Sequence, residues 1–296
     1  MKGKVLQADG KPFQEAFPVV SLHGSTTPFT AETLADASGK FKFKDLLPGT
    51  YTLIIAVARV GQMQRTIEIG PSFAGAKKTV ELTIRFDSKT EADWRSISAR
   101  QLSVPESARR QLEKAQDRLN KHDVPGAVDC LKKAVALAPQ FSVAWNQLGT
   151  IAYQTKDYKQ AEQYFREALK QDPDSFPPLV NLGGALLSEG KVQESLEFNL
   201  QAAKARPDDA LAQSQLGQSY FLEGQLDNAE QHLKKAKRLD PAHFSFPQLV
   251  LAEIYQRRGD YGALKAELEE FLRYHPDSSI SPAVKKALEK VEAHMK

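Results

Sequence analysis

The carboxyl-terminal two thirds of this 296-residue chain are self-similar with a period of 34 residues. Four prolines fall at that spacing and a fifth follows after 35 residues: Pro139, Pro173, Pro207, Pro241 and Pro276. An alanine precedes each of the first four by five residues: Ala134, Ala168, Ala202 and Ala236. Proline cannot continue a helix, and a repeat of this length buries its apolar face only by stacking on its neighbours. The period therefore predicts an array of stacked two-helix units.

The best copy of the repeat reads Trp145-Asn146-Gln147-Leu148-Gly149, followed by Tyr153, Ala161, Phe165, Ala168 and Pro173. This pattern resembles the tetratricopeptide repeat, and the resemblance implies a superhelix with a concave face. The predicted units, which together cover 108–278, are 108–141, 142–175, 176–209, 210–244 and 245–278. In the fifth unit, Leu264 and Phe271 replace small residues, so we expect them to pack under a capping helix at 279–296.

Residues 1–86 have the pattern of short strands separated by turns. Turn signals such as Asp36-Ala37-Ser38-Gly39 and Pro48-Gly49 recur about every ten residues. The predicted strands are 3–7, 18–22, 29–33, 40–44, 51–57, 64–69 and 79–86. We therefore expect an all-β domain, a sandwich of seven antiparallel strands, followed by an all-α solenoid of five helix pairs plus the capping helix.

The strand region contains the run Gly39-Lys40-Phe41-Lys42-Phe43, and then Leu46-Leu47-Pro48-Gly49-Thr50-Tyr51. These segments resemble the carboxypeptidase regulatory-like domain, a transthyretin-like sandwich classed with carbohydrate-binding-like folds. The resemblance implies a bacterial envelope or periplasmic protein. The chain starts at Met1 without an apolar signal segment, so a cytoplasmic location is the alternative. Residues 87–107 are polar and are predicted to be a linker that runs into the first helix.

Charge and composition exclude several classes of protein. The formal net charge is +3, and residues 108–296 carry 26 basic and 26 acidic side chains. A nucleic-acid surface needs a concentrated basic stripe, so we expect no nucleic-acid partner. No apolar run approaches the 18 residues that a membrane span needs, so we expect no membrane insertion. Cys130 is the single cysteine, which excludes an internal disulfide and a multi-cysteine zinc site.

The motifs that would indicate catalysis are absent. The sequence contains no H-E-x-x-H, G-x-S-x-G or G-x-G-x-x-G motif. The stretch from Gly184 to Lys191 has one residue too many for a phosphate loop, and Val192 stands where Ser or Thr is needed. We therefore predict that the protein is not an enzyme, with no catalytic residue, no metal site and no cofactor.

The tetratricopeptide resemblance implies that the concave groove is lined by positions 2, 5, 9, 12 and 13 of each first helix. Position 12 gives Leu119, Tyr153, Leu187, Phe221 and Gln256. With these positions and the adjacent position 6, the predicted groove residues are Gln116, Asn120, Asn146, Thr150, Tyr153, Gln154, Asn181, Leu187, Ser214, Gln218 and Phe221. Amides can bond a peptide backbone, and the apolar residues can take its side chains. The alternative is that the position-12 residues mainly bury against the next helix.

The leading hypothesis is a scaffold whose groove binds a peptide or protein segment. The cations that clamp a terminal carboxylate in some relatives are missing beside Asn181, where Asn146, Thr150, Leu211 and Gln215 stand instead. A second hypothesis is a glycan- or surface-binding role for residues 1–86, with the repeats as an assembly arm. A third is the recognition arm of a larger enzyme assembly.

Overall fold

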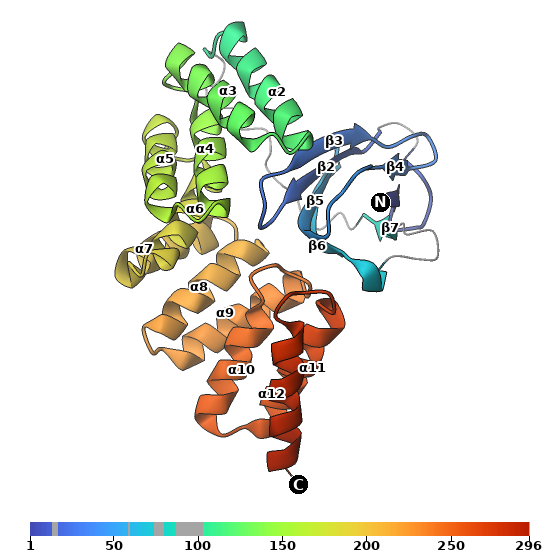
Figure 1. Cartoon of the computed structure of the whole chain (residues 1–296), viewed down its shortest axis with the longest axis vertical. Helices are drawn as coiled ribbons and strands as arrows, with labels where there is room; N and C mark the ends of the chain where they lie inside the picture. The colour runs from blue at the N-terminus through green and yellow to red at the C-terminus, as the bar shows by residue number, and fades with distance from the viewer. Residues whose placement is uncertain (14–16, 59, 74–79, 87–102, 296) are drawn as a thin grey trace. The chain divides into compact units, whose positions relative to one another are not determined.

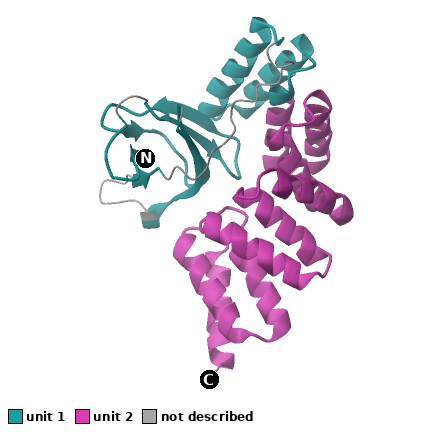
Figure 2. Ribbon diagram, turned by 180° about the vertical axis from the view of Figure 1, so that it is seen from behind, with its two compact units in different colours: residues 1–144 teal, residues 145–296 magenta. Residues whose placement is uncertain are grey.

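A computed structural model describes residues 1–13, 17–58, 60–73, 80–86 and 103–295 (Figure 1). By contacts the chain divides into two compact units, 1–144 and 145–296 (Figure 2). The predicted linker at 87–107 lies mostly outside the described residues. The predicted domain boundaries were placed by the register of the repeats, whereas the two compact units are defined by residue contacts. The predicted domain scheme therefore stays a prediction.

The first unit contains two small sheets. The described strands are β1 (Lys2–Leu6), β2 (Val19–Gly24), β3 (Thr30–Leu34), β4 (Lys40–Lys42), β5 (Gly49–Val57), β6 (Gly61–Ile69) and β7 (Glu81–Arg85). Their orders are β4-β1-β7 and β3-β2-β5-β6. Buried residues alternate with more exposed ones along β2, β4 and β5. Val5, Leu22, Leu53 and Ile84 from both sheets belong to one buried cluster. Each predicted strand is present with shifted ends, whereas the seven-stranded sandwich stays a prediction.

One pairing contradicts the expected antiparallel arrangement, because β7 runs parallel to β1, with Gly3 opposite Leu82. The prediction of seven antiparallel strands was wrong here because the pattern along a strand does not show the direction of its neighbour. The connection from β6 to β7 covers residues 70–80, which is longer than a hairpin loop of about two to five residues. β7 therefore joins the other sheet, and a parallel neighbour is open to it there.

Eleven α-helices follow in the described part of the chain, and they form the five predicted pairs and one further helix. The pairs are α2 (Glu106–Asn120) with α3 (Val124–Leu137), α4 (Ser142–Gln154) with α5 (Tyr158–Gln171), α6 (Phe176–Ser188) with α7 (Val192–Ala205), α8 (Ala210–Leu222) with α9 (Leu226–Leu239), and α10 (Pro247–Arg258) with α11 (Tyr261–Tyr274). The last helix is α12 (Ser281–His294). Each second helix ends two residues before its proline, as the proline spacing predicts.

Aspartates begin three of the second helices. Asp123, Asp157 and Asp260 accept hydrogen bonds from the backbone N–H three residues on, at 3.0, 3.2 and 2.9 Å. A side-chain oxygen in this place satisfies one of the N–H groups that the first turn leaves unpaired. The equivalent residues Lys191 and Gln225 provide no such cap.

Glycines let the two helices of a pair approach. A Cβ atom on Gly149 would lie 2.5 Å from the Phe165 ring, and one on Gly217 would lie 2.6 Å from Leu233. Both distances are too short for a real contact, so these positions admit only glycine without a shift of the neighbour. The repeated spacing between Gly149 and Phe165 and between Gly217 and Leu233 therefore fixes how closely the two helices of each pair pack.

The fifth pair ends the array against α12. Leu264, Phe271 and Val284 belong to one buried cluster, and Leu288 and Val291 pack against it. The bulky pair in the fifth unit thus packs beneath the last helix, as predicted. Exposed Lys285, Lys286 and Glu289 lie on the solvent side of α12. α12 is therefore apolar toward the array and charged outside, which is what a terminal cap requires.

Candidate peptide-binding surface

The first helices of successive pairs lie next to one another in the second unit. α6 packs on α8, and α8 packs on α10. α4 is joined to α6 by the amide of Asn181, whose Nδ2 donates to Asn146 Oδ1 at 3.0 Å. We call α4, α6 and α8 the inner helices, and α5, α7, α9 and α11 the outer helices. The inner helices carry nine of the eleven predicted groove residues; the other two, Gln116 and Asn120, are exposed on α2 in the first unit.

An apolar stripe runs across the inner helices. Tyr153, Leu187 and Phe221 occupy the same position in α4, α6 and α8, 34 residues apart, and each is half-buried. We call these three residues the stripe. Because each keeps part of its surface open, each can both support the helix packing and meet a ligand.

The two aromatic ends of the stripe have polar or aromatic neighbours. The Tyr153 hydroxyl accepts a hydrogen bond from Ser188 Oγ at 3.2 Å, and its ring centroid lies 5.3 Å from that of Tyr158. Burial raises the pKa of Tyr153, so its hydroxyl stays protonated at neutral pH. The Arg257 guanidinium lies 4.4 Å from the centroid of the Phe221 ring. These contacts hold the rings in place, which lowers the entropy that binding would cost.

Uncharged polar side chains border the stripe. Asn146 and Asn181 bond to each other, Thr150 Oγ1 donates to the Asn146 carbonyl at 3.0 Å, and Gln154 is half-buried at the end of α4. An amide group has several donor and acceptor positions, so a pair of asparagines can bond each other and a peptide backbone. This part of the surface can therefore recognise main-chain groups without reading a charge.

Ser214 lies on α8 as predicted, but it is covered and does not line the open surface. Its side chain is fully buried, and its Oγ lies 2.6 Å from Ser245 Oγ, so a ligand on the surface cannot reach it. Gln218 Nε2 is 3.5 Å from both Ser214 Oγ and the Ser245 carbonyl oxygen. Ser245 Oγ also lies 2.6 Å from His243 Nδ1. The unit register identified the helix position of Ser214 but not the loop residues at 243–245 that cover it.

His243 is the buried end of this polar chain. Burial, together with the neighbouring His275, lowers the pKa of His243 to about 3. Its ring is therefore neutral at physiological pH, and one ring nitrogen accepts a hydrogen bond while the other carries the proton. Sequence analysis did not single out this residue; the one available signal was the 35-residue spacing between Pro241 and Pro276, which marks an irregular junction.

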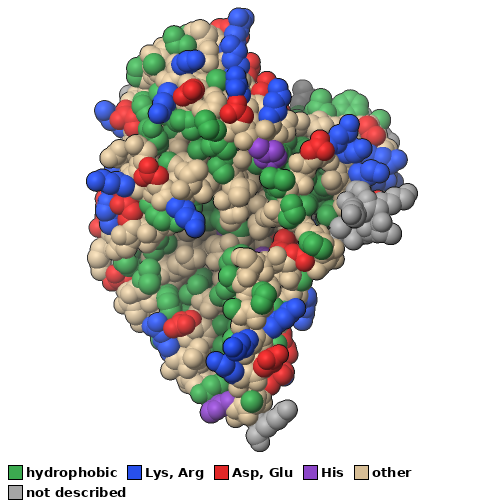
Figure 3. All heavy atoms as spheres, in the orientation of Figure 1, with side chains coloured by type: hydrophobic (Ala, Val, Ile, Leu, Met, Phe, Trp, Pro, Cys, Tyr) green, Lys and Arg blue, Asp and Glu red, His purple; other side chains and the backbone are tan. Residues whose placement is uncertain are grey.

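Charge is divided between the inner and outer helices. α4, α6 and α8 contain no Asp, Glu, Lys or Arg. Ion pairs that involve the outer helices join one helix pair to the next. Arg166 pairs with Glu194 and Lys237 with Glu267 between outer helices, Lys191 just before α7 pairs with Glu162, and Arg258 on α10 pairs with Glu230. Figure 3 shows basic and acidic side chains side by side along the edge over α5 and α7. The inner helices thus offer a ligand hydrogen bonds and apolar contact without a formal charge.

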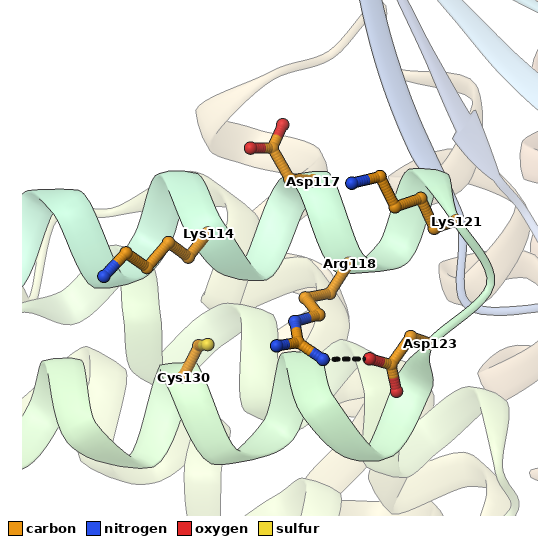
Figure 4. A pocket seen from close by; sticks show the side chains of 6 residues that line it. All are labelled: Lys114, Asp117, Arg118, Lys121, Asp123 and Cys130. Carbon is orange, nitrogen blue, oxygen red and sulfur yellow. Dashed lines mark hydrogen bonds and ion pairs between the residues drawn. The ribbon is translucent and has the colours of Figure 1, made fainter.

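A separate hollow of about 480 Å³ lies on the first helix pair (Figure 4). Its lining is Lys114, Asp117, Arg118, Lys121, Asp123 and Cys130. Arg118 donates to Asp123 across 2.5 Å, and Cys130 is a free, buried cysteine. The three basic and two acidic groups leave little net charge to hold an anion. The Arg118 guanidinium is already paired with the Asp123 carboxylate.

Comparison with known proteins identifies the class of these repeats. Family models described as tetratricopeptide repeat match residues 112–176, 152–218 and 210–243. The described helices and these matches agree, so the helical part of the chain is a solenoid of tetratricopeptide repeats. No helix in the described ranges has the length and apolar character needed to cross a membrane.

Similar proteins share the repeats over part of their length. The chain is 28% identical over 113 residues to the human cell division cycle protein 16 homolog, covering 35% of this chain and 18% of the relative. It is 27% identical over 92 residues to a TPR repeat-containing protein of Rhizobium etli, covering 31% and 45%. The chain thus spans less than half the length of these curated relatives.

Solved structures support the fold. MamA from Desulfovibrio magneticus matches with a TM-score of 0.52 and 21% identity, covering 60% of this chain and 99% of that one. PilF from Pseudomonas aeruginosa matches with 0.54 and 20%, covering 64% and 85%. A chain of the APC/C hetero-tetramer Cut9-Hcn1 matches with 0.57 and 20%, covering 66% and 38%. The family matches lie on the helices, so the resemblance of residues 1–86 to the carboxypeptidase regulatory-like domain stays a prediction.

Proposed function

We propose that this chain is a non-enzymatic scaffold that binds a segment of a partner protein on its inner helices. Tetratricopeptide repeats typically act as protein-interaction scaffolds, and stacked repeats form extended binding surfaces. The observation that carries the proposal is the stripe: Tyr153, Leu187 and Phe221 stand in one register and stay half-open. The uncharged polar groups beside it supply the bonds that an apolar surface lacks.

A library of random peptides displayed on phage, selected on the full-length protein, tests this function. Selected peptides should bind the protein in solution and lose binding to a variant with Tyr153→Ala, Leu187→Ala and Phe221→Ala. The matched control is Leu200→Ala, which removes an exposed leucine (42% exposed) from the outer helix α7. Circular dichroism checks that both variants keep their helices.

The expected result is a loss of at least about tenfold in affinity for the triple variant, equivalent to one or two interface contacts, and no loss for the control. Peptides that bind both variants equally would place the binding site away from the stripe. A selection that yields no peptide would overturn the proposed function.

A further inference from the structure

The spacing of the stripe restricts the shape of a bound segment. Two hydrogen bonds connect α4 with α6 across the inner surface, from Asn181 to Asn146 and from Ser188 to Tyr153. α6 packs directly on α8. Helices packed this way have axes about 8–10 Å apart. The three stripe residues therefore recur at about that interval across the helices, since they share one position within each helix.

A polyproline II segment has the same interval. It rises about 3.1 Å per residue with three residues per turn, so it returns to the same face about every 9 Å. A chain in this conformation that crosses the inner helices would place every third side chain on the stripe. It also makes no internal hydrogen bonds, so its backbone groups stay free for the amides beside the stripe. An α-helical ligand would satisfy its own backbone and leave those amides unused.

The absence of charged residues from α4, α6 and α8 restricts the composition of a bound segment. A charged ligand side chain that entered this surface would lose water and find no opposite charge on α4, α6 or α8. The Arg257 guanidinium of α10 lies 4.4 Å from the centroid of the Phe221 ring, and its charge is already paired with Glu253 at 3.2 Å. The surface therefore rejects charged segments and accepts neutral ones.

We propose that the inner helices recognise an uncharged, proline-rich segment that carries an apolar residue at every third position. This inference rests on the proposed function. One apolar side chain contacts each of Tyr153, Leu187 and Phe221. The aromatic rings at the two ends of the stripe also fit the flat face of a proline ring.

Synthetic peptides test this with the full-length protein and isothermal titration calorimetry. The first probe is a blocked 12-residue peptide with four Leu-Pro-Gln repeats. The second has the same composition with leucine at irregular spacing. The third and fourth replace each glutamine by glutamate or by lysine. We expect the regular neutral peptide to bind at least about tenfold more tightly than the other three. Its affinity should change little between low and high salt, because no ion pair forms.

A charge placed in the stripe provides the converse test. Leu187→Lys should lower affinity for the neutral peptide and raise affinity for the glutamate peptide above it. Leu187→Met, which keeps an apolar side chain of similar volume, should keep the original order. This pair of variants separates a change of selectivity from a loss of folding.

The outcomes distinguish the two proposals. Equal binding of regular and irregular peptides, or tighter binding of a charged peptide to the unmodified protein, would overturn this inference. So would no binding of any of the four. If library peptides still lose affinity in the triple stripe variant, the proposed function survives that result. If library peptides bind the triple variant normally, the proposed function fails, and this inference fails with it.

Discussion

Replacing Asn199 by leucine should stabilise the protein. Asn199 lies in α7 with no exposed surface, and its Nδ2 donates to Ser195 Oγ and Ser219 Oγ at 2.9 Å. Its Oδ1 has no hydrogen-bond partner. The equivalent residues of the neighbouring units are Phe165 and Leu233, both buried and apolar. Asn199 is thus a polar residue in a place that the repeat otherwise fills with apolar side chains.

The two serines do not depend on Asn199. Ser195 Oγ donates to the Gly183 carbonyl at 3.1 Å, and Ser219 Oγ donates to the Gln215 carbonyl at 3.0 Å. Asn199→Leu therefore leaves no hydroxyl without an acceptor. Leu233 already packs over Gly217 in the next unit, which indicates that leucine fits beside the equivalent Gly183.

The magnitude follows from three contributions. Removing the unpaired buried carbonyl gains about 1–3 kcal/mol, and losing two side-chain hydrogen bonds costs a similar amount. Burying leucine adds about 1.5–3 kcal/mol. We expect the free energy of unfolding to rise by about 2 kcal/mol and Tm by about 4–8 °C. Thermal and urea unfolding followed by circular dichroism measure both.

The control is Asn199→Asp, which keeps the shape but introduces a charge that burial disfavours, and it should lower Tm. A lower Tm for Asn199→Leu with unchanged helix content would refute the reasoning. It would show that the polar network contributes more than an apolar contact at the same place.

Three further predictions concern other parts of the fold. The pKa of His243 is about 3 in the folded protein, so this residue should cost about 1.4 kcal/mol of stability for each pH unit below 6.5. His243→Gln should reduce this pH dependence, which urea titrations at pH 7 and pH 5 measure. Gly39→Ala should lower Tm more than Gly10→Ala, because both have positive φ but only Gly39 would put a Cβ against the Val5 carbonyl. Val284→Asp should detach α12, lower Tm and increase binding of a hydrophobic dye, whereas Lys285→Asp on its exposed side should not.

The helical part was predictable from the sequence because the same residue pattern recurs in each of the five units. Proline ends each second helix, and small residues such as Gly149 and Gly217 set the packing of each pair. Strand positions were also predictable, since inward and outward residues alternate. The pairing of β7 with β1 was not, because it depends on where a long connection leads and not on local pattern.

The candidate site likewise has a part that the sequence could predict and a part that it could not. Register places Tyr153, Leu187 and Phe221 in equivalent positions, and the structure finds all three half-buried. Register could not show that Ser214 is covered, because the covering residue Ser245 belongs to an irregular junction. It also could not reveal the buried network around Asn199, because period analysis compares residue size and apolar character, not hydrogen-bond partners.

The outer ion pairs give the array a response to ionic strength. They join successive pairs through flexible, partly exposed side chains, such as Lys191 with Glu162 at 2.6 Å, whereas the inner helices touch directly. Salt screens exposed charges and leaves apolar packing intact. As salt rises, the exposed ion pairs should weaken, while the packing of α5 on α6 and of α7 on α8 keeps the outer helices in place. The second unit should therefore lose stability at high salt but keep its curvature.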